Sequence, residues 1–165
     1  MVAITVLTVG FLGITTLLVK SFFLSRVTAN DLTATYLASE GVEVAKNLLD
    51  HDLYSGAAWG TCGGDCTVAA GEYTLDYATG ESGVDQLTSA LCPGPYLYLD
   101  PTTNLYTDAN YSGAEVKTAF QRCVKIVHDP SGSGQEVTVD SIVTWSTGVI
   151  TSQNIDLQDH FYNWQ

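Results

Sequence analysis

The stretch MVAITVLTVGFLGITTLLVKSFFL, at Met1–Leu24, decides the fold. It holds no ionisable side chain before Lys20, and most of its residues are aliphatic. About 20 consecutive apolar residues suffice for a helix that crosses the hydrocarbon core of a bilayer. A signal peptide would show a basic start and a small-residue cleavage site, and this stretch has neither. This apolar segment (residues 1–24) therefore predicts a membrane-competent helix rather than a signal peptide or a buried core helix.

The helix is expected to continue to residue 53, with residues 25–53 as an amphipathic half. No proline precedes Pro93, so nothing forces a break, although glycines such as Gly41 are weaker points that cost about 1 kcal/mol each. The expected apolar face of this half consists of Val27, Leu32, Tyr36, Leu37, Val44, Leu48 and Leu49. Fifty helical residues span roughly 75 Å, far more than the ~13 Å radius of gyration of a domain made from the rest. We therefore expect half of the helix to protrude.

The charges divide the chain in the same way. The protein has 6 Lys and Arg against 18 Asp and Glu, which gives a net charge of -12. Residues 1–46 are neutral overall, so the whole net charge lies in residues 47–165. An excess of acidic groups argues against nucleic-acid binding, because affinity for phosphate comes mostly from cations. With 45% hydrophobic residues the chain is not a disordered acidic tail either.

Residues 54–165 are expected to form an acidic globular head with disulfides. The part from 55 to 115 is rich in turn residues, with a short strand expected at Glu72–Tyr77. Three alternating segments follow, and they predict an antiparallel meander: Ala119–Val127, Glu136–Ser146 and Val149–Leu157. The aromatic end, residues 161–165, is expected to pack on the sheet or the helix. The predicted class is α+β, with the long helix packed on a small C-terminal antiparallel sheet.

This organisation resembles the type IV pilins and the related pseudopilins. The segment MVAITVLTVGFLG at Met1–Gly13 looks like the start of the mature pilin helix with its first few residues missing. The segment LASEGVEVAKNLLD at Leu37–Asp50 is similar to the helix that leads into the head of prepilin-type proteins. The stretch AFQRCVKIV and the terminal YNW also resemble that group. The resemblance covers about the first 53 residues well and the rest in outline.

One departure concerns the N-terminus. The family's short leader ending in glycine, and the glutamate that follows it, have no counterpart before Met1. Thr5 is a poor substitute for that glutamate. We expect the sequence to be truncated, because every later position then falls in phase with the family.

The resemblance implies a structural subunit, the major pilin of a bacterial type IV pilus. It implies a single-pass inner-membrane protein that polymerises with copies of itself into an extracellular filament, served by a pilus assembly machinery and a prepilin peptidase. Gly10 and Gly13 are candidates for local unwinding in the filament, with a straight helix as the alternative. The residues expected in the filament core are Val2, Ile4, Val6, Leu7, Val9, Gly10, Phe11, Leu12, Gly13, Ile14, Leu17 and Leu18.

Two other functions stay open at this point. The chain is alternatively a minor pilin or a type II secretion pseudopilin in a short periplasmic assembly. It is also compatible with a bitopic membrane protein whose head binds a ligand and never polymerises.

Four cysteines allow three pairings, and spacing alone does not choose between them. We favour Cys62–Cys66, which closes a small loop containing two glycines, together with Cys92–Cys123. A four-cysteine zinc site is the weaker alternative, because structural zinc sites usually show two tight pairs and only one is present.

The remaining signals for chemistry are weak. Asp108, Asn110 and Ser112 match the first half of a calcium loop, but Ala119 stands where the bidentate carboxylate belongs. The three histidines have no recognisable partners, and phosphate loops and nucleophile motifs are absent. We therefore expect no enzymatic activity, no cofactor, no metal and no nucleic acid along the filament.

Overall fold

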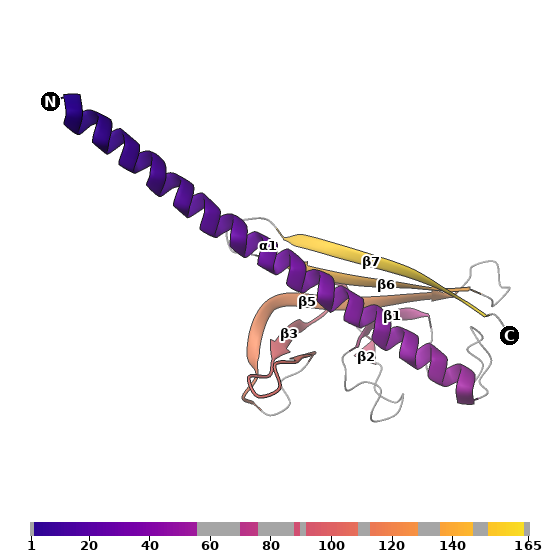
Figure 1. The fold of residues 1–165 in the computed structure, drawn as a ribbon. Coiled ribbons are helices and arrows are strands. Elements are labelled where there is room, and N and C mark those ends of the chain that lie inside the picture. The colour runs from indigo at the N-terminus through magenta and orange to yellow at the C-terminus, as the bar shows by residue number, and fades with distance from the viewer. Residues whose placement is uncertain are drawn as a thin grey trace. The chain divides into compact units, whose positions relative to one another are not determined.

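The computed structural model describes residues 2–55, 70–75, 88–89, 92–108, 113–128, 136–146 and 152–163. Its one described helix, α1, runs from Val2 to Ser55 (Figure 1). The chain divides into two compact units, Met1–Thr33 and Ala34–Gln165. The second half of α1 therefore belongs with the sheet, and the first half forms a unit of its own.

The sheet of the second unit is antiparallel throughout and has seven strands. The long β5 pairs with β6 along one edge and with the short β1 and β3 along the other. Strand β2 extends β1, β4 extends β3, and β7 extends β6. The strands are β1 Gly71–Thr74, β2 Thr88–Ser89, β3 Tyr96–Leu99, β4 Tyr106–Thr107, β5 Val116–His128, β6 Glu136–Trp145 and β7 Gln153–Tyr162. One helix on one antiparallel sheet confirms the predicted α+β class.

The predicted meander is present as β5, β6 and β7. The buried side chains of β6 alternate strictly, from Val137 to Trp145, as period-two patterning requires. The predicted position of the last strand was too early in the chain. Strand β7 continues to Tyr162, five residues beyond the predicted end at Leu157. Its register explains the difference, because Gln153 pairs with Trp145 and each later residue follows β6 back to Glu136.

Helix α1 packs on the sheet through small residues. Its buried stripe contains Ala34, Ala38, Gly41 and Ala45, flanked by leucines. A Cβ atom on Gly41 would fall on Ser141 Oγ and lie 3.1 Å from Val124 Cγ2, so the helix backbone lies directly against the sheet there. This close approach explains why a glycine stands at position 41, although glycine is unfavourable within a helix.

Part of the predicted apolar face of α1 was wrong. Leu37, Leu48 and Leu49 are buried as expected, but Leu32 and Tyr36 are 56% and 69% exposed. The docked face is selected by how closely helix and sheet approach, so alanines occupy it where larger side chains were expected. A prediction of the buried face from the positions of large apolar residues was therefore partly wrong.

Arg122 lies in the centre of the helix–sheet interface and is 1% exposed. Its Nη1 donates to the carbonyl of Leu37 in α1 at 3.0 Å and lies 3.1 Å from a carboxylate oxygen of Glu40. Its Nη2 donates to the carbonyl of Leu75, the residue after β1. One buried cation thus fastens the helix, β1 and β5 together, since burial without such partners would be costly.

Candidate functional site

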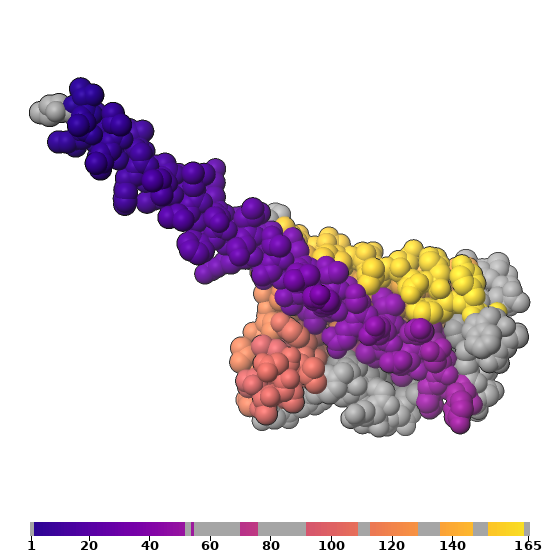
Figure 2. All heavy atoms as spheres, in the orientation of Figure 1, coloured from indigo at the N-terminus to yellow at the C-terminus, as the bar shows by residue number. Residues whose placement is uncertain are grey.

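The candidate site is the surface of α1 within the apolar segment. All fourteen of its large hydrophobic side chains from Val2 to Leu24 are exposed, between 47% at Phe23 and 78% at Val2. Figure 2 shows these side chains uncovered along the visible face of the segment. Soluble monomers rarely expose apolar patches larger than a few hundred Å², and larger ones mark contacts with membranes or other proteins. This surface therefore requires a cover.

The threonine side chains within the apolar segment are satisfied internally. The hydroxyl groups of its four threonines donate to backbone carbonyls three or four residues earlier, at 2.7–3.2 Å. In hydrocarbon, unsatisfied polar groups cost several kcal/mol, so such back-bonding makes threonine compatible with an apolar surrounding. The segment is long and apolar enough to cross a membrane once. These threonines do not weaken that property.

Gly10 and Gly13 lie in an unbroken part of α1. A Cβ atom at either glycine would meet no atom within 4 Å, so nothing within this chain requires a glycine there. Small residues allow close approach between helices in membranes and bundles. The predicted unwinding concerns an assembled form and stays a prediction.

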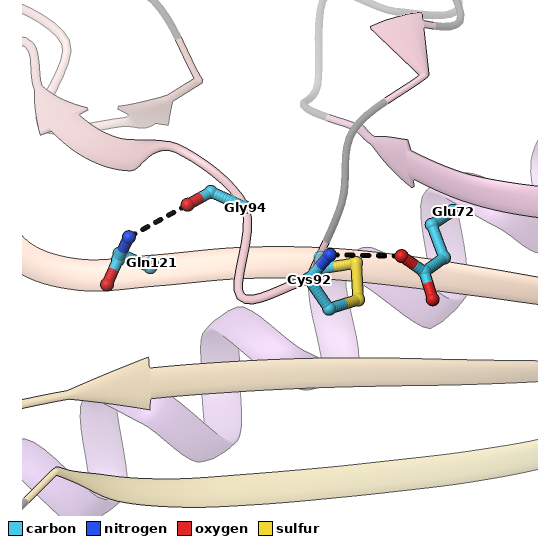
Figure 3. The surroundings of a disulfide bond; sticks show 5 residues. Glu72, Cys92, Gly94 and Gln121 are labelled. Carbon is cyan, nitrogen blue, oxygen red and sulfur yellow. Dashed lines mark hydrogen bonds between the residues drawn. A yellow bond between two sulfur atoms is a disulfide. The ribbon is translucent and has the colours of Figure 1, made fainter.

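The second unit is fastened by a disulfide between Cys92 and Cys123 (Figure 3). This is one of the two pairings that the sequence favoured, and Cys62 and Cys66 lie outside the described residues. Sulfurs in a disulfide are not thiolates, so the four-cysteine zinc alternative does not hold for this oxidised form.

The loop that carries Cys92 is held from two sides. The Cys92 N–H donates to the Glu72 carboxylate at 3.0 Å, and Gln121 Nε2 donates to the Gly94 carbonyl at 2.8 Å (Figure 3). Gly94 has a φ of 78°, and a Cβ atom there would strike the carbonyl oxygen of the residue before Cys123. A glycine is therefore required for this loop to lie on β5. The loop joins the β1 side of the sheet to β5.

The sequence missed a polar cluster where the start of β6 pairs with the end of β7. His160 Nδ1 lies 2.7 Å from Glu136 Oε1, and the Tyr162 hydroxyl donates to the same carboxylate oxygen at 3.0 Å. This hydrogen bond, and then the charge of Glu136, raise the pKa of Tyr162. Strand pairing brings these residues together from 24 to 26 positions apart, which no local motif signals.

The other expected sites receive little support. Asp108 lies just after β4, while Asn110 and Ser112 lie outside the described residues, so the calcium loop stays a weak prediction. The Glu72 carboxylate lies within 4.8 Å of both disulfide sulfurs, but the disulfide removes these sulfurs as metal ligands.

A long apolar N-terminal helix followed by a small antiparallel sheet with a disulfide is compatible with a pilin-like fold. Comparison of the chain with protein-family models, with curated proteins and with solved structures finds no match.

Proposed function

We propose that this chain is the major structural subunit of a bacterial type IV pilus or a closely similar filament. It polymerises with copies of itself through the apolar segment of α1. Before assembly it is a single-pass protein of the inner membrane, and afterwards it is part of an extracellular fibre. The role is structural rather than enzymatic, and it needs no cofactor.

The observation that carries this proposal is the exposure, on every side of the helix, of the large apolar side chains from Val2 to Leu24. A helix that docks on its own domain needs one apolar stripe, as the second half of α1 has. A helix that is apolar all round is surrounded by lipid or by other helices. Lipid tails and neighbouring helices are similarly apolar, so transfer from the membrane into a bundle changes apolar burial little. The same surface therefore serves both states.

One further feature supports a filament. Contacts between copies that do not close into a ring generate an open helical polymer. The acidic second unit keeps the outside of such a polymer soluble and disfavours nucleic acid along its length. The resemblance to pilins supplies the remaining partners, a prepilin peptidase and an assembly machinery.

Imaging of surface fibres tests the proposal directly. Cells that express the chain are sheared, and the fibres are examined by cryo-electron microscopy to identify the repeating subunit. A fibre made of this chain throughout supports a major pilin. If this chain is found only at a fibre tip or in short periplasmic assemblies, it is a minor pilin or pseudopilin instead. Material that stays monomeric in the membrane refutes polymerisation.

A charge in the apolar segment separates assembly from folding. Leu12→Glu places a carboxylate on a helix surface that lipid or other helices must cover, which costs a few kcal/mol. We expect loss of fibres with an unchanged unfolding curve for the second unit. The matched control is Leu105→Glu, an exposed leucine in the second unit, which should leave fibres intact. Equal fibre yields from both variants would contradict assembly through the apolar segment.

A further inference from the structure

Strand β7 is a long edge of the sheet that pairs only with β6 among the described strands. All ten of its residues, Gln153–Tyr162, are in register with β6, so the strand is regular from end to end (Figure 1). A regular edge presents backbone N–H and C=O groups that can pair with another strand. Charged residues on an edge normally oppose such pairing, so their positions decide whether a partner fits.

The charges of β7 select one register for pairing with a second copy of itself. Antiparallel pairing about a two-fold axis places one residue opposite its own copy. Centring on Asp156, Asp159 or His160 places identical side chains of like charge opposite each other, which destabilises a sheet. Centring on Leu157 places every charged residue opposite a neutral one. Centring on Gln158 places Asp156 opposite His160 of the second copy, and symmetry makes this contact twice.

The apolar residues of β7 fit the same register. On the face toward α1, Ile155 stands opposite Phe161 of the second copy, and both side chains are partly exposed in the single chain. Leu157, which is 37% exposed, stands opposite Asp159. On the other face Asn154 stands opposite Tyr162. In this register the apolar pair of Ile155 and Phe161 lies on the face toward α1, and the pair of Asp156 and His160 lies on the other face.

The imidazole of this contact is already positioned within the single chain. His160 lies beside the Glu136 carboxylate, with Thr138 Oγ1 3.4 Å from its Nδ1 and Gln158 Oε1 3.3 Å from its Nε2. The His160 ring therefore lies among polar groups of its own chain, and Asp156 of the second copy adds another carboxylate.

We propose that β7 is a contact surface for a second copy of this chain, paired antiparallel and centred on Gln158. The two copies are inverted relative to each other. Subunits within one helical filament share one direction, so this contact joins subunits of two neighbouring filaments. Only the placement of this contact between two filaments rests on the proposed function, because the pairing of two β7 strands does not itself require a filament.

Disulfide trapping tests the register. Gln158→Cys is introduced into the full chain in detergent micelles. Residues directly opposite in a sheet have Cβ atoms about 4.5–5.5 Å apart, close enough for a disulfide after a small shift. The matched control is Asn154→Cys on the same face. Its two copies would lie roughly 27 Å apart in this register.

We expect severalfold more cross-linked dimer from Gln158→Cys than from Asn154→Cys under mild oxidation. Adding Asp156→Lys to the first variant should lower the dimer yield severalfold, because a lysine then faces His160. Adding Asp50→Lys, an equal charge change on the exposed face of α1, should not lower it. Equal trapping at both cysteine positions, or strongest trapping from Leu157→Cys, overturns the proposed register.

The outcome is separable from that of the proposed function. Fibres of the unmodified chain without Gln158→Cys trapping refute the β7 contact and leave the filament proposal standing. Trapping in micelles without any fibres refutes the filament and leaves the β7 contact standing.

Discussion

The two halves of helix α1 share one backbone and have opposite surroundings. In the apolar segment every large side chain is exposed, and glycines meet nothing. From Ala34 onward one stripe of small residues is buried against the sheet, and Gly41 lies directly on Ser141. The comparison shows that apolarity alone did not select the docked face. The docked face is the one whose small side chains let the helix backbone lie close to the sheet. The more apolar half of the helix is available to partners outside the chain.

Removal of the disulfide is expected to give the largest difference between the second unit and the apolar segment. Replacing Cys92 and Cys123 by serine opens a loop of sequence separation 31 and should lower the free energy of unfolding by about 3–4 kcal/mol. The apolar segment has no cysteine, so its helicity in detergent should not change. Fluorescence of the buried Trp145 during denaturation and circular dichroism of the micelle-bound helix measure the two effects. A loss below about 1 kcal/mol would show that the disulfide does not stabilise the sheet.

A somewhat smaller loss is expected from Arg122→Met. The change leaves Glu40 and the Leu75 carbonyl without their buried donor, which should cost about 3 kcal/mol. The control is Lys125→Met on the same strand, where the side chain is exposed, and it should change the unfolding free energy by less than about 0.5 kcal/mol. Equal effects of both variants in urea denaturation would mean that Arg122 does not fasten the helix to the sheet.

One substitution should have opposite signs in the two halves. Gly41→Ala gains about 1 kcal/mol in helix propensity but forces Ser141 and Val124 away, so a net loss of about 1 kcal/mol is expected. Gly13→Ala has open space around it and should stabilise the helix by up to about 1 kcal/mol. Thermal unfolding of the second unit measures the first effect, and helicity in micelles measures the second. A stabilising Gly41→Ala would show that the helix can move off the sheet freely.

The smallest effect concerns pH. The Asp100 carboxylate accepts the Thr102 N–H at 2.7 Å and the Thr103 hydroxyl at 2.8 Å, and these hydrogen bonds lower its pKa. A lowered folded-state pKa means stabilisation that is present above the ordinary aspartate value of about 4 and is lost as pH falls through the folded value. Acidification should therefore speed amide exchange at Thr102, after correction for intrinsic rates.

Asp100→Asn provides the control for this effect, since it removes the titration and should flatten the pH dependence at Thr102. The apolar segment has no ionisable side chain before Lys20 and should not respond. An unchanged pH profile in Asp100→Asn would assign the effect to another group.

Much of the fold was predictable because its signals are local. The apolar segment, the unbroken helix and the alternation of β5 and β6 are all patterns among near neighbours in the chain. Strands β3 and β4 were not predicted, because each is short and owes its place to pairing with β5 or with the other. The end of β7 was misplaced for a related reason, since its register depends on β6 rather than on its own pattern.

The sequence by itself determined that one end of this protein is too apolar to stay uncovered, because that property needs only composition and length. It also predicted an acidic head with a small antiparallel sheet and favoured the Cys92–Cys123 disulfide. Only the tertiary structure decided which face of the helix docks, because that choice depends on backbone distance. It alone also paired Arg122 with the Leu37 carbonyl, 85 residues away, and placed β7 at an edge of the sheet that the described strands form. Such contacts join distant residues, and a linear pattern carries no signal for them.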